Sequence, residues 1–277
     1  MLNIPASVGS LLSAPVVAAE HEGEGFHAPS ISEFFPAQLV GEGTWWGPTR
    51  INLIGLLMTA ALVFFFVLAF RRTTLVPRGL QNLGEMAVDA VYVNIIDEVM
   101  GVRGRRFAPL LVTLFWMILA FNVSGILPLL HMPATAIIGV PLVLALVVYV
   151  VFNWAGVKAS GAVPYLKMNL IPPGIPKPLY ALVIPIEFVS TFLLRPFTLA
   201  IRLMANMMAG HLLLVLFYSA TSYFLLEADG LAKSLGVVSY AAGFAFTLFE
   251  CLVIVLQAYI FTLLTAVYID GATSAEH

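Results

Sequence analysis

Apolar residues gather into long runs along this chain, with short polar or basic segments between them. The runs cover residues 51–70, 107–130, 138–157, 179–226 and 231–269. Each is long enough to cross the hydrocarbon core of a bilayer as a helix, which takes roughly twenty residues. A transmembrane β-barrel would instead alternate apolar and polar residues over segments of about ten. The pattern therefore predicts an all-α polytopic membrane protein with about five transmembrane helices.

The last two runs are each longer than one perpendicular crossing requires. Either run could form two crossings or one steeply tilted helix. No turn of Gly, Pro, Asn or Asp with flanking Lys or Arg divides them, whereas the acidic segment 227–230 separates one run from the other. We therefore expect two long, tilted, antiparallel helices.

The positions of the basic residues predict the orientation of the chain in the membrane. Arg71 and Arg72 follow the first run, and a second basic cluster lies at 101–106. Because positive charges mark the cytoplasmic ends of membrane helices, we expect residues 1–48 to form an external tail. Residues 49–277 then form a single membrane domain with its C-terminus in the cytoplasm.

Three segments between the runs are more polar. Residues 80–100 carry carboxylates among apolar side chains, which suits a helix lying in the membrane interface. The sequence His-Met-Pro at 131–133 predicts an outer turn. The Lys- and Pro-containing segment 158–178 predicts a loop that returns the chain to the cytoplasm.

The composition narrows the function. Hydrophobic residues make up 61% of the chain and charged residues 10%, which excludes a soluble globule with a polar surface. The net charge is −2 and no basic patch is interleaved with aromatic residues, so we expect no nucleic-acid partner. Glycine-rich nucleotide loops are missing, and no oxygen-rich cluster resembles a cation cage. We expect no cofactor, no metal site and no nucleotide chemistry in this chain.

Arg202 lies near the middle of the 179–226 run, with apolar residues on both sides. Holding an ionised side chain deep in a bilayer costs from about 2.5 to more than 10 kcal/mol, and a guanidinium stays protonated at any ordinary pH. Such a residue can snorkel or pair inside the protein for purely structural reasons. Its distance from the ends of the run favours a function instead.

When the last two runs fold into a hairpin about the acidic segment between them, polar residues of one run lie at the same membrane depth as polar residues of the other. Asn206 lies one helical turn beyond Arg202, and Gln257 lies at the depth of Arg202. His211, on a different face, lies at the depth of Glu250. The spacing predicts an inner layer with a fixed positive charge and an outer layer whose two side chains can exchange protons. A buried His–Glu ion pair without proton traffic is the alternative for the outer layer.

Two more charged residues lie near the predicted cytoplasmic end of the 179–226 run. Glu187 could be a helix-dipole partner or part of a pathway to the cytoplasm. Arg195, directly before Pro196, is close enough to the inner surface to reach lipid phosphates or water. We expect Arg195 to be structural, with a kink at the proline.

Residues 195–211 read RPFTLAIRLMANMMAGH. This stretch closely resembles the signature helix of subunit a of F-type ATP synthase. Residues 249–269 resemble the last helix of that family and residues 121–128 an earlier one, so the resemblance extends from about residue 50 to the C-terminus. It implies a non-catalytic, proton-translocating stator subunit. Its implied partners are protons, membrane lipid, the rotating c-ring and the b subunits of the peripheral stalk.

The resemblance also implies roles for single residues. Arg202 corresponds to the family's essential arginine, which faces the carboxylates of the c-ring and separates two aqueous half-channels. Its polar companions in the family are matched by Asn206, Gln257 and Tyr268.

Other positions depart from the family pattern. His211 and Glu250 match a pair that other members carry as Glu then His. The reversed order keeps one acid and one imidazole, which supports contact between them. Gly125 stands where some members place an Asp in the outer half-channel, which leaves Asn122 and Ser124 there.

By this resemblance, protons enter from outside past His211 and Glu250, protonate a ring carboxylate and leave past Glu187, while Arg202 prevents a direct leak. A stand-alone proton channel or proton-coupled transporter is the alternative, although no internal repeat pairs two halves of the chain. A purely structural membrane anchor is a third hypothesis. We expect a bacterial plasma membrane, with an organelle inner membrane as the alternative.

Overall fold

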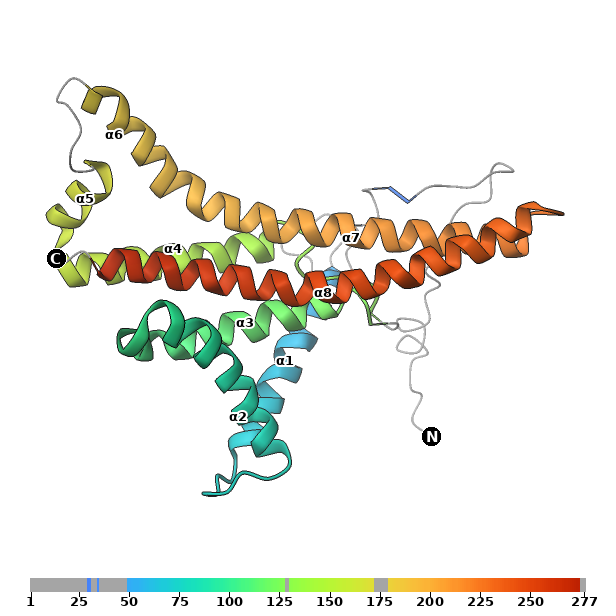
Figure 1. Ribbon diagram of the computed structural model, residues 1–277, viewed down its shortest axis with the longest axis horizontal. Helices are drawn as coiled ribbons and strands as arrows, with labels where there is room; N and C mark the ends of the chain where they lie inside the picture. Colours follow the sequence, from blue (N-terminus) through green and yellow to red (C-terminus); the bar gives the residue numbers. More distant parts are fainter. Residues whose placement is uncertain (1–28, 31–33, 35–48, 128–129, 172–178, 275–277) are drawn as a thin grey trace, which may run out of the picture.

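The chain folds into a bundle of helices. The structure, a computed structural model, describes residues 29–30, 34, 49–127, 130–171 and 179–274. The α-helices in chain order are α1 (Arg50–Phe70), α2 (Leu80–Val91), α3 (Ala108–Val123), α4 (Gly139–Ser160), α5 (Ala162–Leu170), α6 (Tyr180–Phe188), α7 (Arg195–Leu226) and α8 (Ala232–Thr273). Among the described residues, 5 helical segments are long and apolar enough to cross a membrane (Figure 1). The predicted all-α polytopic class is confirmed.

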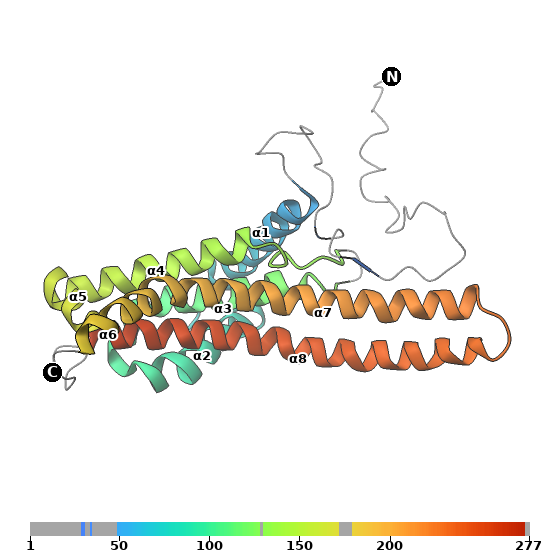
Figure 2. The same ribbon diagram turned by 90° about the horizontal axis from the view of Figure 1, so that it is seen from above.

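The hairpin of α7 and α8 forms the long axis of the molecule. The two helices lie side by side and antiparallel (Figures 1 and 2). At about 1.5 Å per residue, the 42-residue α8 is about 63 Å long, roughly twice the thickness of a bilayer's hydrocarbon core. The prediction of two long antiparallel helices is confirmed. In the turn between them, Gly230 has a φ of 64°, which glycine adopts most readily.

Helix α6 leads into α7 through a segment of wider helical turns. The residues Val189–Leu194 form a π-helix between the two, and the whole helical stretch is Tyr180–Leu226. Pro196, in the first turn of α7, has no N–H to donate to the preceding turn. A π turn next to it keeps the chain helical while redirecting it, and Figure 1 shows α6 bending away from α8. The expected kink therefore lies just before Arg195 and Pro196.

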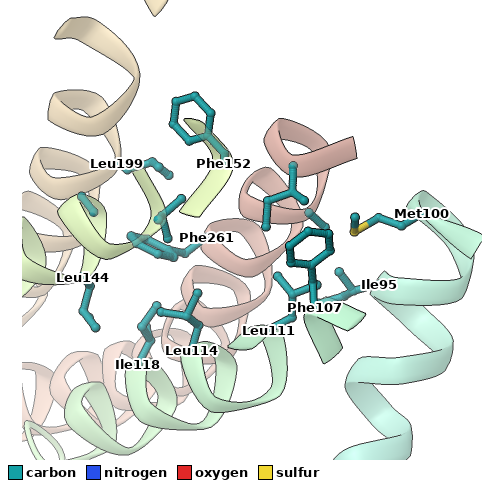
Figure 3. Close-up of a cluster of buried hydrophobic side chains, with 14 of the residues drawn as sticks. Ile95, Met100, Phe107, Leu111, Leu114, Ile118, Leu144, Phe152, Leu199 and Phe261 are labelled. Carbon is teal, nitrogen blue, oxygen red and sulfur yellow. The ribbon is translucent and has the colours of Figure 1, made fainter. Parts of the chain in front are cut away.

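Helices α3 and α4 pack against the hairpin and supply its core. α3 packs on α8, and α4 packs on both α7 and α8. In the buried cluster (Figure 3), Phe152 of α4, Leu199 of α7 and Phe261 of α8 are each at most 2% exposed. Buried alanines such as Ala200 and Ala258 let the backbones approach closely, which favours association of helices in lipid.

Helices α1 and α2 form a second hairpin that diverges from the bundle (Figure 1). α2 is amphipathic, with Ala87 and Val91 buried and Asp89 exposed, and it continues into the π-helix Tyr92–Asp97. The indole N–H of Trp116 donates a 2.8 Å hydrogen bond to the carbonyl of Ala87, which fixes α2 to α3. The amphipathic helix expected at 80–100 is therefore present.

The end of α3 differs from the expected run to residue 130. The helix stops at Val123, and the residues that follow fold back over its end. The N–H of Ala134 donates to the carbonyl of Phe121 at 3.3 Å, and Gly125 lies against Pro133. Apolar composition alone cannot reveal this stop, because Ile126, Leu127 and Leu130 are as apolar as the residues of the helix.

The segment after α4 contains a helix, α5, where lysines and prolines predict a loop. Pro164 falls in the first turn of α5, where its missing N–H has no intrahelical acceptor to lose. Tyr165 packs directly against Gly156 of α4 and donates a 3.2 Å hydrogen bond to Asn153. The loop prediction is wrong for these residues.

Gly84 lies where α1 and α2 pack tightly. A Cβ atom on residue 84 would lie 2.8 Å from the Cβ of Ala69, too close for two carbon atoms. Gly84→Ala is therefore expected to separate the two helices and to destabilise the protein by about 1–3 kcal/mol. The measurement is the thermal unfolding midpoint of the purified protein in detergent.

Gly271→Ala in α8 is the matched control. No described atom lies within 4 Å of its added Cβ, and alanine is the better helix former by about 1 kcal/mol. This variant should unfold at or above the parent midpoint. An unchanged midpoint for Gly84→Ala would contradict the tight contact.

Candidate functional site

Arg202 lies on the exposed face of α7. Together with Asn206 and Gln257 it lines an open depression of about 500 Å³ between α7 and α8. The rest of the lining is small or aliphatic: Ala205, Ala209, Val253, Leu256 and Ile260. The structure therefore brings together the three residues of the predicted inner layer.

The polar groups of this depression are under-satisfied within the described part of the chain. There the guanidinium of Arg202 makes no hydrogen bond or ion pair. Gln257 is 5% exposed, and its Nε2 has no hydrogen-bond acceptor among these residues. An unpaired buried amide donor costs about 1–3 kcal/mol, and an arginine in an apolar span costs more. The depression is thus a surface that a further polar group can complete.

His211 and Glu250, the residues of the predicted outer layer, share a second, much smaller cavity of about 10 Å³, called the outer cavity below. They are 7% and 4% exposed, and Asn122 of α3 lines the same cavity. Gly210 makes this possible, because the Glu250 carboxylate lies where a side chain on residue 210 would begin. His211 and Glu250 therefore lie at the same depth, as predicted. The contacts of the described residues include no ion pair between them.

Two further residues, which no pattern in the sequence indicates, contact side chains that line this cavity. Phe34 is 1% exposed, and its ring lies edge-on to the imidazole of His211, with 5.3 Å between ring centroids. Thr135 is fully buried and bonds to Asn122 at 2.6 Å. Both residues lie outside the long apolar runs. Most of the tail at 1–48 falls outside the described residues, so its external position stays a prediction.

The structure does not bring Tyr268 and Glu187 into either cavity. The Tyr268 ring centroid lies 5.3 Å from the guanidinium carbon of Arg195 and 6.0 Å from the Phe152 ring. Arg195 therefore packs on Tyr268 through a cation–π contact. Glu187 is half-buried on α6. Roles in proton transfer for Tyr268 and Glu187 stay predictions.

Neither cavity has the donor set of a metal site. Within the ranges that the structure describes, no group of three or more His, Cys, Asp or Glu side chains could hold a metal ion. The chemistry that the side chains themselves offer is proton exchange at His211 and Glu250 and a fixed positive charge at Arg202.

Comparison with known proteins decides the family. The family model for the ATP synthase A chain matches residues 53–270. The chain belongs to this family. Its similarity to the ATP synthase subunit a of Rhodococcus erythropolis (strain PR4 / NBRC 100887) is 50% identity over 96% of this chain and 95% of that protein. The ATP synthase subunit a of Parafrankia sp. (strain EAN1pec) is 42% identical over 91% and 86% of the two chains.

Membership of the ATP synthase A chain family confirms the resemblance that residues 195–211 carry. The chain is a multi-pass membrane subunit of an F-type ATP synthase. The matched range of residues 53–270 includes every helical position that lines the two cavities. The site is thus built within the part of the chain that defines the family.

The contact between Gly210 and Glu250 gives a test of the outer cavity. Gly210→Ala would place a methyl group inside the space of the carboxylate. We expect Glu250 to be displaced and ATP-driven proton pumping by the assembled complex to fall severalfold. Pumping is measured in inverted membrane vesicles by quenching of a pH-sensitive dye.

A second substitution shows whether the loss comes from this contact. Glu250→Asp retracts the carboxylate, so the double variant should pump better than Gly210→Ala alone. Gly271→Ala serves as the glycine control and should pump normally. Normal pumping by Gly210→Ala would mean that the close approach is not required.

Proposed function

We propose that this chain is the stator subunit that couples proton flow to rotation of the c-ring in the same complex. In this proposal it offers the ring two aqueous half-channels, one open to each side of the membrane. The observation that carries the proposal is Arg202, an exposed guanidinium at mid-helix with no partner in the described chain, inside a depression of small and aliphatic residues.

A carboxylate on another membrane subunit is the group that best fits this depression. A guanidinium pairs with a carboxylate through charge-assisted hydrogen bonds, and a charge held away from water is stabilised by an opposite charge. Ala205 and Ala209 leave room for a helix of the ring to approach α7 closely. A positive neighbour also favours the deprotonated form of the ring carboxylate.

The cavity of His211 and Glu250 is the outer half-channel in this proposal, with Asn122 in its wall. A proton enters from outside, passes these side chains and reaches a ring carboxylate. After the ring turns, the proton leaves to the cytoplasm past Glu187. Arg202 stands between the two paths, and its fixed charge repels a hydrated proton. Transport then requires rotation.

The energy scale suits a rotary machine. One proton crossing a potential of 100 mV supplies about 2.3 kcal/mol, so several protons are needed for each ATP. The A chain contributes the path and the barrier, and the nucleotide chemistry takes place on other subunits.

Charge and topology support an N-terminus outside and a C-terminus in the cytoplasm of a bacterial plasma membrane. Arg71 and Arg72 follow α1, and Arg103 precedes α3. Since positive charges mark the cytoplasmic side, α3 and α7 then run outward, and α4 and α8 run back. In Figure 1 the C-terminal end of α8 lies at the end of the bundle opposite the α7–α8 turn. Membrane lipid and the b subunits of the peripheral stalk complete the proposed partners.

Removal of the charge at Arg202 tests the proposal. Arg202→Ala in the assembled complex should reduce ATP-driven proton pumping to background, and passive proton leak should rise because the barrier between the half-channels is lost. Lys233→Ala, at an exposed position near the start of α8, is the control and should pump normally. Preserved, tightly coupled pumping by Arg202→Ala would overturn the proposal and favour a structural anchor.

The isolated chain separates the stator from a stand-alone channel or transporter. Reconstituted alone in liposomes, a half-channel subunit should carry almost no protons, and transport should appear when the ring is added. Rapid proton flow through the isolated chain would favour the channel.

Exchange of the outer pair tests whether His211 and Glu250 act together. His211→Glu combined with Glu250→His keeps one acid and one imidazole in the same cavity. The double exchange should retain more ATP-driven pumping than either single replacement. A double variant as impaired as the worse single variant would contradict functional coupling between the two side chains.

A further inference from the structure

The segment between α3 and α4 forms one wall of the outer cavity. Pro133 lines this cavity with His211 and Glu250. The hydroxyl of Ser124 lies 2.6 Å from the carbonyl oxygen of Phe121 and 3.0 Å from that of Met132, and it accepts a 3.3 Å hydrogen bond from the N–H of Ala134. These contacts attach the segment to the end of α3 through Met132 and Ala134.

Thr135 adds a further contact to α3, with the side chain of Asn122. Its hydroxyl donates a 2.6 Å hydrogen bond to the Oδ1 of Asn122, and both residues are 0% exposed. A side-chain amide has one oxygen acceptor and two N–H donors. The bond from Thr135 to the oxygen therefore fixes where the two N–H groups can point.

The amide nitrogen of Asn122 needs a partner that the described chain does not supply. Nδ2 is buried and has no hydrogen-bond acceptor among the described residues, although Asn122 lines the cavity with His211 and Glu250. The cavity measures about 10 Å³, close to the minimum of roughly 10–15 Å³ that one water occupies, and a buried water needs two to four polar partners. Asn122, His211 and Glu250 supply three such partners.

We propose that Thr135 is a positioning residue that orients Asn122 to hold a single water between His211 and Glu250. The inference rests on the proposed half-channel function and adds to it a residue and a bound ligand. Asn122 takes no proton itself. Its N–H donates to the water oxygen and keeps the water in line with the two titratable side chains.

The held water passes a proton from His211 to Glu250 with no net change in itself. An N–H bond of protonated His211 breaks as a new O–H bond forms on the water. One of the water's original O–H bonds breaks as an O–H bond forms on the Glu250 carboxylate. Loss of the Thr135 hydroxyl frees the Asn122 amide to rotate, so that aligned geometry occurs less often and each transfer is slower.

Paired substitutions at residue 135 test this role in the assembled complex. Thr135→Val keeps the branched shape and removes the hydroxyl, whereas Thr135→Ser keeps the hydroxyl. For Thr135→Val we expect proton-driven ATP synthesis in vesicles to fall on the order of threefold to tenfold, the loss of one buried hydrogen bond. The ratio of rates in H₂O and D₂O should rise, because proton transfer becomes the slow step. Thr135→Ser should restore most of the rate and the parent isotope ratio.

Thr113→Val is the matched control. Thr113 is an exposed threonine of α3 whose hydroxyl bonds to the carbonyl of Pro109 in its own helix, at 2.7 Å. This variant should keep the parent rate and isotope ratio. Two outcomes for Thr135→Val overturn the inference: an unchanged rate, or a lower rate with an unchanged isotope ratio, which a purely structural role predicts.

If Thr135→Val does not assemble, a structure of the parent complex tests whether the water is present. A high-resolution density map of the parent complex should show one water within hydrogen-bond distance of Asn122 Nδ2 and of His211 or Glu250. A cavity without that water overturns the inference. Arg202→Ala, measured in parallel, separates the two proposals. Normal pumping by Arg202→Ala would overturn the half-channel function. Normal ATP synthesis by Thr135→Val, with Arg202→Ala inactive, would overturn only the role of Thr135.

Discussion

A guanidinium that cannot lose its proton is held near the middle of a long apolar helix, and the rest of the arrangement depends on that constraint. The stretch Tyr180–Leu226 presents Arg202 on its exposed face, and α8 brings Gln257 to the same level. Because Arg202 has no anionic partner in the described chain, the charge is best accommodated in a complex. In the proposed function, a ring carboxylate that moves past Arg202 turns this electrostatic requirement into a barrier that protons cross only on the ring.

The two cavities differ in size, and the difference matches their proposed roles. The depression at Arg202 is wide and lined by alanines and aliphatic side chains, which suits contact with a moving partner. The cavity at His211 and Glu250 is small and lined by residues of α3, α7, α8 and the segment after α3. There Gly210 admits the carboxylate and Thr135 fixes Asn122. The tightly packed core of α3, α4, α7 and α8 keeps the two cavities in a fixed relation.

The sequence predicts the long helices and both polar layers, because helical spacing and a single turn determine which residues share a depth. Arg202 with Gln257, and His211 with Glu250, follow from that geometry alone. Helical spacing does not predict helix α5, the early end of α3 or the contacts of Phe34 and Thr135. They depend on tertiary contacts, such as Tyr165 on Gly156 and Ala134 on Phe121, that leave no periodic pattern. Tyr268, assigned by resemblance to the surroundings of Arg202, packs on Arg195 instead.

The central claim concerns what Arg202 faces in the assembled machine, and a density map of the intact complex tests it most directly. The account predicts that the depression lined by Arg202, Asn206 and Gln257 lies against the c-ring. In that map the guanidinium should be within about 3–4 Å of a ring carboxylate, the range of a charge-assisted hydrogen bond or close ion pair. A map in which this face of α7 and α8 meets lipid, or in which Arg202 pairs within its own chain, would contradict the account.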